Sequence, residues 1–305
     1  MSRFGRLSGI AGAVVASFFG GIYAERKGAL QNAKAASDAL TMPMPTLTSP
    51  SAEASINVKQ PTSRASQIMQ YGYPGFENVR SFEDFVLSYD RRNRTPLWVI
   101  EHLTPSRLVY DPLVDRSKCA FMEDKSMHPY FRSANNDYLN SGYDRGHLAA
   151  AGNHRKTQNA INQTFLLSNI APQVGKGFNR DKWNELEKRV RKIARRSENV
   201  YVCSGPLFLP HIENDGKMYV KYRVIGQNNV AVPTHFFKVL LIEFSPGKFD
   251  LEAYVLPNEK IPDSTPLKAF FMPLEAIERS AGFLIFEKLP KESLRYVNGQ
   301  EANFL

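Results

Sequence analysis

The sequence contains a short motif whose residue types suit the hydrolysis of a phosphate ester. The motif is Asp144-Arg145-Gly146-His147, within the run YDRGHLAAAGNH. It places an orienting carboxylate, a guanidinium that can bind phosphate and a candidate general base within a few ångströms of one another. Because Gly146 has no side chain, we expect it to let the backbone approach a ligand closely. The motif therefore predicts acid–base chemistry on a phosphodiester.

His147 is the candidate base because imidazole has an ordinary pKa of about 6.5 and is largely neutral at physiological pH. With that pKa, activity should fall as the pH drops through about 6.5. A lone histidine is more often a core residue than a catalyst. The remaining histidines lack comparable neighbours and are interpreted as structural: His102, His128, His154, His211 and His235.

A helix is predicted from about Arg180 to Arg196, with an apolar stripe that begins at Trp183. On this helix Asn179 and Glu187 fall on the side that faces the protein body. A carboxylate at the edge of a buried stripe costs free energy unless it is paired or bound to a cation. Two structural explanations stay open, since Asn179 could cap the helix and Glu187 could pair with a basic neighbour.

The functional explanation is a hard cation such as Mg²⁺, which takes oxygen ligands and keeps several waters. Asn179 would supply a neutral oxygen directly to the ion. Glu187 would lie about 12 Å away along the axis if both residues are helical. It is therefore expected to hold water around the ion rather than to bind it.

Three blocks of sequence occur in an order that identifies a relationship. They are DRGH at 144–147, SNIAPQ at 168–173 and FNRDKWNELE at 178–187. The chain resembles the DNA/RNA non-specific endonuclease family, which has the ββα-metal fold, over about residues 70 to 285. The resemblance implies a Mg²⁺-dependent endonuclease, with Mn²⁺ as a substitute, that acts on DNA and RNA and leaves 5′-phosphate ends.

The resemblance also implies a role for each matching residue. His147 would be the general base, Asn179 the direct Mg²⁺ ligand, and Glu187 the group that orients water on the metal. Arg145 and Asn169 would support the phosphate and the geometry of the site, together with Asp144. The family uses one further arginine upstream.

Two residues fit the place of that upstream arginine, Arg116 and Arg132, and we favour Arg132. The resemblance further implies a homodimer in the mitochondrial intermembrane space that enters the nucleus in cell death, with apoptotic nuclear cofactors as partners. Two alternatives stay open: a 5′-exonuclease of the same family and a catalytically inactive basic nucleic-acid-binding protein.

The elements that would position these residues are mainly strands. Apolar or alternating runs followed by short Gly/Asn turns predict antiparallel pairing. The fold class is α+β, with a central, mainly antiparallel sheet flanked by helices. The predicted strands are 97–103, 199–209, 218–225, 234–244 and 249–256.

The composition excludes several classes of protein and of metal site. Its 305 residues are 43% hydrophobic and 23% charged, which excludes a wholly disordered chain and a multi-spanning membrane protein. Two cysteines exclude a disulfide scaffold and a four-cysteine zinc site. We expect a mitochondrial targeting or hydrophobic segment at 1–24 that could associate with the inner membrane, a flexible linker at 25–66, a nuclease domain at 67–295 and a C-terminal tail at 296–305.

Positive charge is concentrated on the predicted helix. The formal net charge is +9, and residues 176–196 carry nine basic and three acidic residues. Apart from Lys176, the basic residues, Lys182 among them, fall on the side of the helix predicted to face solvent. A basic protein of this kind favours a polyanionic partner. The residues expected to contact nucleic acid there are Lys188, Arg189, Arg191 and Lys192, together with Arg132 from outside the helix.

Overall fold

The computed structural model describes residues 63–302. The expected targeting segment, 1–24, and residues 25–62 of the expected linker lie outside this range. The first helix, α2 (Arg64–Ile68), already includes the last residues assigned to the linker. At the other end, β13 and β14 continue the sheet past residue 295, so the described part of the expected tail is paired. Within 63–302, no helix has the length and apolar character needed to cross a membrane.

One large sheet organises the described residues and confirms the α+β class. Its eight strands run in the order β1-β2-β3-β6-β11-β12-β13-β14. Every pair is antiparallel except β12 with β13, which is parallel. The strands are β1 (Val79–Ser81), β2 (Phe85–Asp90), β3 (Thr95–Leu103), β6 (Asn199–Leu207), β11 (His235–Ser245), β12 (Lys248–Pro257), β13 (Leu294–Val297) and β14 (Gln300–Glu301).

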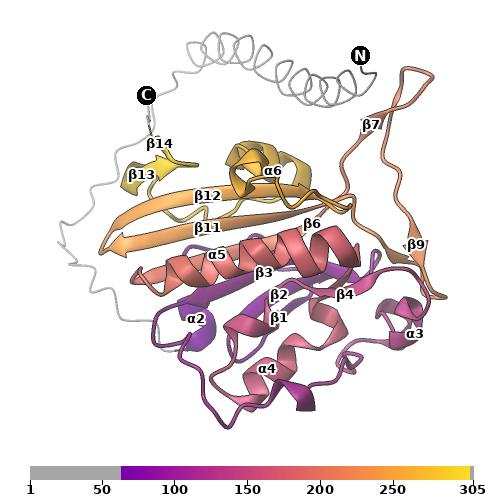
Figure 1. The fold of residues 1–305 in the computed structure, drawn as a ribbon, viewed down its shortest axis with the longest axis horizontal. Helices are drawn as coiled ribbons and strands as arrows, with labels where there is room; N and C mark the ends of the chain where they lie inside the picture. Colours follow the sequence, from indigo (N-terminus) through magenta and orange to yellow (C-terminus); the bar gives the residue numbers. More distant parts are fainter. Residues whose placement is uncertain (1–62, 303–305) are drawn as a thin grey trace, which may run out of the picture. The chain divides into compact units, whose positions relative to one another are not determined.

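Both faces of this sheet are covered, which explains why β11 is almost continuously apolar. One face packs against α5 (Asn184–Ala194) through Leu186 and Val190. The opposite face packs against α2 and α6 (Leu274–Ala281) through Ile68 and Ile277. Figure 1 shows α5 lying along the sheet beside β11.

The strand prediction was correct for β3, β6, β11 and β12 but wrong for 218–225. Only β8 (Met218–Tyr219) and β9 (Val224–Ile225) are strands there, and most of the segment is exposed. β8 pairs with β7 (His211–Ile212) in a hairpin that projects from the body, and β9 pairs with β10 (Val230–Ala231) (Figure 1). The two-residue alternation therefore marked an exposed arm rather than a half-buried strand.

A second, small pairing carries the motif. β4 (Asp144–His147) pairs antiparallel with β5 (Ile170–Gln173), and the chain then enters η6 (Gly175–Trp183) and α5. This strand–strand–helix order is the ββα unit. The motif is therefore extended backbone held in register by β5, so His147 lies opposite Ile170. The remaining helical segments are α3 (Asn135–Tyr138), α4 (Gln158–Thr164), η2 (Arg116–Lys118), η3 (Pro129–Phe131), η4 (Ala151–Asn153), η5 (Leu167–Asn169), η7 (Leu267–Phe270) and η8 (Lys291–Ser293).

Candidate active site

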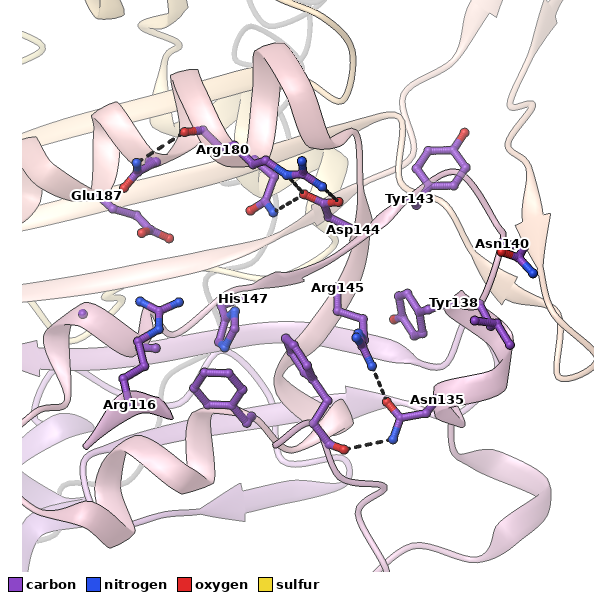
Figure 2. Close-up of a pocket in the computed structure, with 17 residues that line it drawn as sticks. Arg116, Asn135, Tyr138, Asn140, Tyr143, Asp144, Arg145, His147, Arg180 and Glu187 are labelled. Carbon is purple, nitrogen blue, oxygen red and sulfur yellow. Dashed lines mark hydrogen bonds and ion pairs between the residues drawn. The ribbon is translucent and has the colours of Figure 1, made fainter. Parts of the chain in front are cut away.

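A cavity of about 660 Å³ lies between β4, η6 with α5, and η2. Figure 2 shows its lining, with Glu187 projecting from the helix toward the side on which His147 lies. The cavity gathers five of the six residues that the sequence predicted for catalysis and metal binding. They are Asp144, Arg145, His147, Asn179 and Glu187, joined by Arg116.

His147 is enclosed by aromatic rings. The ring of Phe165 lies 4.7 Å away, edge to face, and that of Phe121 lies 5.4 Å away, measured between ring centroids. Burial, followed by the positive charges of Arg116 and His154, lowers the pKa of His147 to about 3. Its Nε2 is buried and has no hydrogen-bond partner among the described residues. The ring is therefore a neutral imidazole with a free nitrogen.

This environment changes the expected pH dependence. We expect His147 to stay neutral from pH 7 down to about pH 5, because its lowered pKa favours the neutral, proton-accepting form over that range. The fall in activity through pH 6.5 expected from an unperturbed imidazole should therefore not come from this residue. NMR titration of the ring Cε1–H signals measures this directly. A midpoint for His147 near the ordinary imidazole value of about 6.5 would contradict the expectation.

Asp144 orients Asn179 rather than His147. Its Oδ2 accepts a hydrogen bond from Asn179 Nδ2 at 3.0 Å, and its two oxygens accept from Arg180 at 2.7 and 2.6 Å. The hydrogen bond from Arg180, which outweighs partial burial, lowers the pKa of Asp144. Since the amide nitrogen of Asn179 is occupied, its Oδ1 is the end left available to a ligand.

Glu187 approaches the cavity from the first turn of α5 and is mostly buried. Burial raises its pKa, while the positive charges of Lys238 and Arg191 oppose that shift. Its nearest cation is Arg191, with Nη1 4.0 Å from Oε2. The expected pairing with a basic neighbour is thus present only at long range, and Glu187 keeps acceptor capacity for another ligand.

Arg145 is held in place from both sides. Its Nη1 donates to Asn135 Oδ1 at 2.7 Å, and its guanidinium lies 4.2 Å from the centroid of the Phe121 ring. Figure 2 shows the hydrogen bond to Asn135. These contacts leave a positioned cation on the cavity wall that can bind a phosphate oxygen.

The preference for Arg132 as the upstream arginine is not supported by its position, because Arg116 and not Arg132 lines the cavity. The Arg132 guanidinium lies 3.0 Å from Glu123 and donates to the Met127 carbonyl. Arg116 starts η2 behind the N-cap Asp115 and has no ion pair among the described residues. Arg116 is therefore the better candidate.

Two motif residues shape the site without lining it. Asn169 is fully buried, and its amide bonds to both backbone groups of Ala149 and to the carbonyl of Thr164. It therefore fixes the chain two residues after His147. Gly146 faces Gln173, because a Cβ there would lie 2.1 Å from that side chain. The close approach expected at Gly146 is thus made by the neighbouring strand, not by a ligand.

The basic residues of α5 differ in how free they are. Lys188 and Lys192 are exposed. Arg189 forms ion pairs with Glu252 and bonds to the Tyr254 hydroxyl, and Arg191 bonds to Asn153. Only the two lysines of the expected set of four are therefore uncommitted on this helix.

Lys182 departs further from the expected basic face. It is 2% exposed and donates to Glu185 and to the carbonyls of Asp263 and Thr265. These partners neutralise and satisfy the buried ammonium group. Lys182 is therefore a structural residue of the fold.

Several lining residues were not selected from the sequence. Arg180 and Asn184 stand with Glu187 at helical spacings of four and three residues, a periodicity that could have identified them. Phe121 and Phe165 lie far apart in the sequence and carried no such signal.

The donor set of the cavity fits a hard cation. Within residues 63–302 there is no group of three or more His, Cys, Asp or Glu side chains placed to hold a metal ion. The available donors are instead the oriented Oδ1 of Asn179 and the carboxylate of Glu187, both oxygen. Mg²⁺ prefers oxygen and is often held by one or two protein groups with several waters.

Comparison with known proteins agrees with this geometry. The sequence model of the DNA/RNA non-specific endonuclease family matches residues 64–292. The chain is 58% identical over 243 residues to the mitochondrial endonuclease G of Caenorhabditis elegans, covering 80% of this chain and 79% of the relative. It is 54% identical over 218 residues to the human mitochondrial endonuclease G, covering 72% of each.

The fold agrees as well. A chain of the solved EndoG/EndoGI complex superposes with a TM-score of 0.78 at 56% identity, covering 80% of this chain and 100% of that one. The matched span includes the ββα unit and every residue of the cavity named above. The chain therefore belongs to the DNA/RNA non-specific endonuclease family.

Proposed function

We propose that this protein is a Mg²⁺-dependent, sugar-non-specific endonuclease that hydrolyses DNA and RNA to 5′-phosphate ends. The observation that carries the proposal is the meeting of His147, Asn179 and Glu187 in one cavity with Arg145 and Arg116. A neutral base, oxygen donors for a hard cation and guanidinium groups for phosphate are the components that phosphodiester hydrolysis needs.

In this proposal His147 takes a proton from the attacking water, whose oxygen bonds to phosphorus as the bond to the 3′ oxygen breaks. The 3′ oxygen leaves as a hydroxyl after it takes a proton from solvent. The lowered pKa of His147 keeps the ring neutral before the reaction. Arg145, fixed by Asn135, binds a non-bridging phosphate oxygen, and Arg116 supplies a second positive charge beside the base. Both cations offset the charge that develops on the phosphate.

A bound Mg²⁺, or Mn²⁺ in its place, would supply Lewis-acid stabilisation of the phosphate and the leaving oxygen. Asn179 would hold it through Oδ1, with the amide turned by Asp144. Glu187 would hold water molecules around the ion. Asp144 is in turn paired with the exposed Arg180.

A supercoiled plasmid tests the activity. With Mg²⁺ the protein should convert the closed circle to nicked and then linear DNA, and it should also degrade a single-stranded RNA. A strict 5′-exonuclease would leave the circle intact but digest a linear duplex. Cleavage of none of the plasmid, the linear duplex and the RNA would indicate the inactive binding protein instead.

The salt dependence of DNA binding should distinguish the exposed lysines of α5 from its ion-paired arginine. Replacing Lys188 and Lys192 with glutamine should flatten the slope of log Kobs against log salt by roughly one to two, because each lost phosphate contact releases less counterion. Replacing Arg189 with glutamine should alter the slope less, since its guanidinium is paired with Glu252. The measurement is fluorescence anisotropy on a labelled duplex in the presence of EDTA. If the variant with both lysines replaced has the same slope as the wild-type protein, α5 does not face the DNA.

The proposal extends to location and assembly. Both mitochondrial relatives, and the basic, acid-free start of this sequence, support residence in the mitochondrion. We place the protein in the intermembrane space, with association of residues 1–24 with the inner membrane, as a homodimer. Release to the nucleus in cell death and contact with apoptotic nuclear cofactors belong to the same proposal. Imaging a C-terminally tagged protein before and after induction of cell death tests the location.

A further inference from the structure

A buried chain of polar contacts runs from the core to Glu187. His154 Nε2 lies 2.9 Å from Glu101 Oε1, and Asn153 Nδ2 donates to the same oxygen at 2.8 Å. Asn153 Oδ1 then accepts from Arg191 Nη1 at 3.1 Å. Glu101 and His154 are 1% exposed and Asn153 is 4% exposed. Water therefore cannot replace these contacts, and losing one would leave a buried polar group unsatisfied at a cost in free energy.

The charge of His154, at the inner end of these contacts, decides which way the Asn153 amide is turned. Burial would by itself lower the pKa of His154, but its contacts with Asp84 and Glu101 raise the pKa to about 9. A protonated His154 keeps Glu101 ionised and so an acceptor only. Asn153 must therefore point its NH₂ group at Glu101, which turns its Oδ1 toward Arg191.

The guanidinium of Arg191 is positioned by Asn153 rather than by the carboxylate of Glu187. Its only side-chain hydrogen bond within residues 63–302 is the one to Asn153, whereas Glu187 lies 4.0 Å away. The same group lies over Gly152, where an added Cβ would be 3.0 Å from Nη1. Asn153 and Gly152 together thus set where the positive charge stands relative to Glu187.

We propose that Asn153, held by Glu101, is a positioning residue that fixes Arg191 against Glu187 for catalysis; the inference rests on the role proposed above for Glu187. Arg191 Nη1 lies 4.0 Å from Glu187 Oε2, so the position of the guanidinium decides where the carboxylate meets a positive charge. Asn153 does not line the cavity, so its side chain reaches Glu187 through Arg191.

A double-mutant cycle tests this directly. Asn153→Ala should lower kcat on a duplex oligonucleotide roughly tenfold and leave KM within about twofold, because the interaction serves the chemical step rather than binding. In the Arg191→Ala background the same change should lower kcat by less than about twofold. The same decrease in kcat in both backgrounds would overturn the proposal, because Asn153 would then act independently of Arg191.

A structural readout does not depend on activity. In a crystal structure of the Asn153→Ala protein without added metal, the Arg191 guanidinium should leave its place beside Glu187. An unmoved guanidinium would overturn the inference. If Asn153→Ala fails to fold, Gly152→Ala supplies the second variant. Its Cβ would lie 3.0 Å from Nη1, so the guanidinium should shift by a few tenths of an ångström while the Asn153–Glu101 bond remains. Gly152 also lines the cavity, so the test is that its loss of kcat vanishes in the Arg191→Ala background.

The matched control is Asn199→Ala. Asn199 bridges a carboxylate, Glu243, and the ring of His102, as Asn153 bridges Glu101 and Arg191, but it does not reach the cavity. Its kcat should stay within about twofold of wild type. If Glu187→Gln and Arg191→Ala are both fully active, the role proposed for Glu187 fails; if they are impaired while Asn153→Ala is not, only the positioning inference fails.

Discussion

Replacing His147 with alanine should lower kcat on plasmid DNA by roughly 10³-fold, the contribution that a positioned general base makes in enzymes. The imidazole is the only neutral base that lines the described cavity, since the other nitrogen-bearing side chains there are arginines and asparagine amides. Binding of DNA should change little, because Arg145 and Arg116 remain. Steady-state kinetics on a fluorescent duplex, with anisotropy for binding, separates the two effects.

The matched control is His211→Ala, which removes an exposed histidine from β7 outside the cavity. It should retain wild-type activity. Cleavage by His147→Ala at a rate near that of this control would exclude His147 as the base.

Replacing Asn179 with alanine should raise the Mg²⁺ concentration for half-maximal activity by roughly 10- to 100-fold and lower kcat at saturating Mg²⁺. The reason is that its Oδ1 is the oriented neutral oxygen of the cavity, with the amide nitrogen held by Asp144. Asp144→Ala should give a weaker form of the same defect, because the amide would be free to turn. Titration of activity against Mg²⁺ for each protein measures this order.

The control for this series is Asn162→Ala on α4, which bonds to Cys119 and Gln158 outside the cavity. Its metal dependence should match wild type. An unchanged Mg²⁺ requirement in Asn179→Ala would remove this residue from the metal site.

The central strands and the long helix were predictable from local pattern. β11 and β12 carry runs of apolar or alternating residues, and the stripe on α5 repeats at helical spacing. The same helical periodicity correctly predicted that Asn179 and Glu187 lie on the side of the helix that faces the protein body. It failed at Lys182, whose partners Asp263 and Thr265 come from a segment far along the chain.

Distance in sequence explains the other differences. Arg116 and Arg132 fit the same place in the sequence, and only the folded structure shows that Arg116 lines the cavity while Arg132 pairs with Glu123. The pKa of His147 depends on Phe121 and Phe165, which no local motif connects to it. The burial of Asn153 beside Glu101 likewise arises from packing between β3 and η4. Tertiary packing, rather than residue type, decides each of these cases.

The most direct measurement is the anomalous scattering of Mn²⁺ soaked into crystals of this protein. A single strong peak is expected inside the cavity, within direct bonding distance of Asn179 Oδ1 and on the side facing His147 and Glu187. The peak should be lost in Asn179→Ala crystals soaked in the same way. A peak bound elsewhere in wild-type crystals, with the cavity empty, would show that the imidazole and the amide do not serve one metal ion.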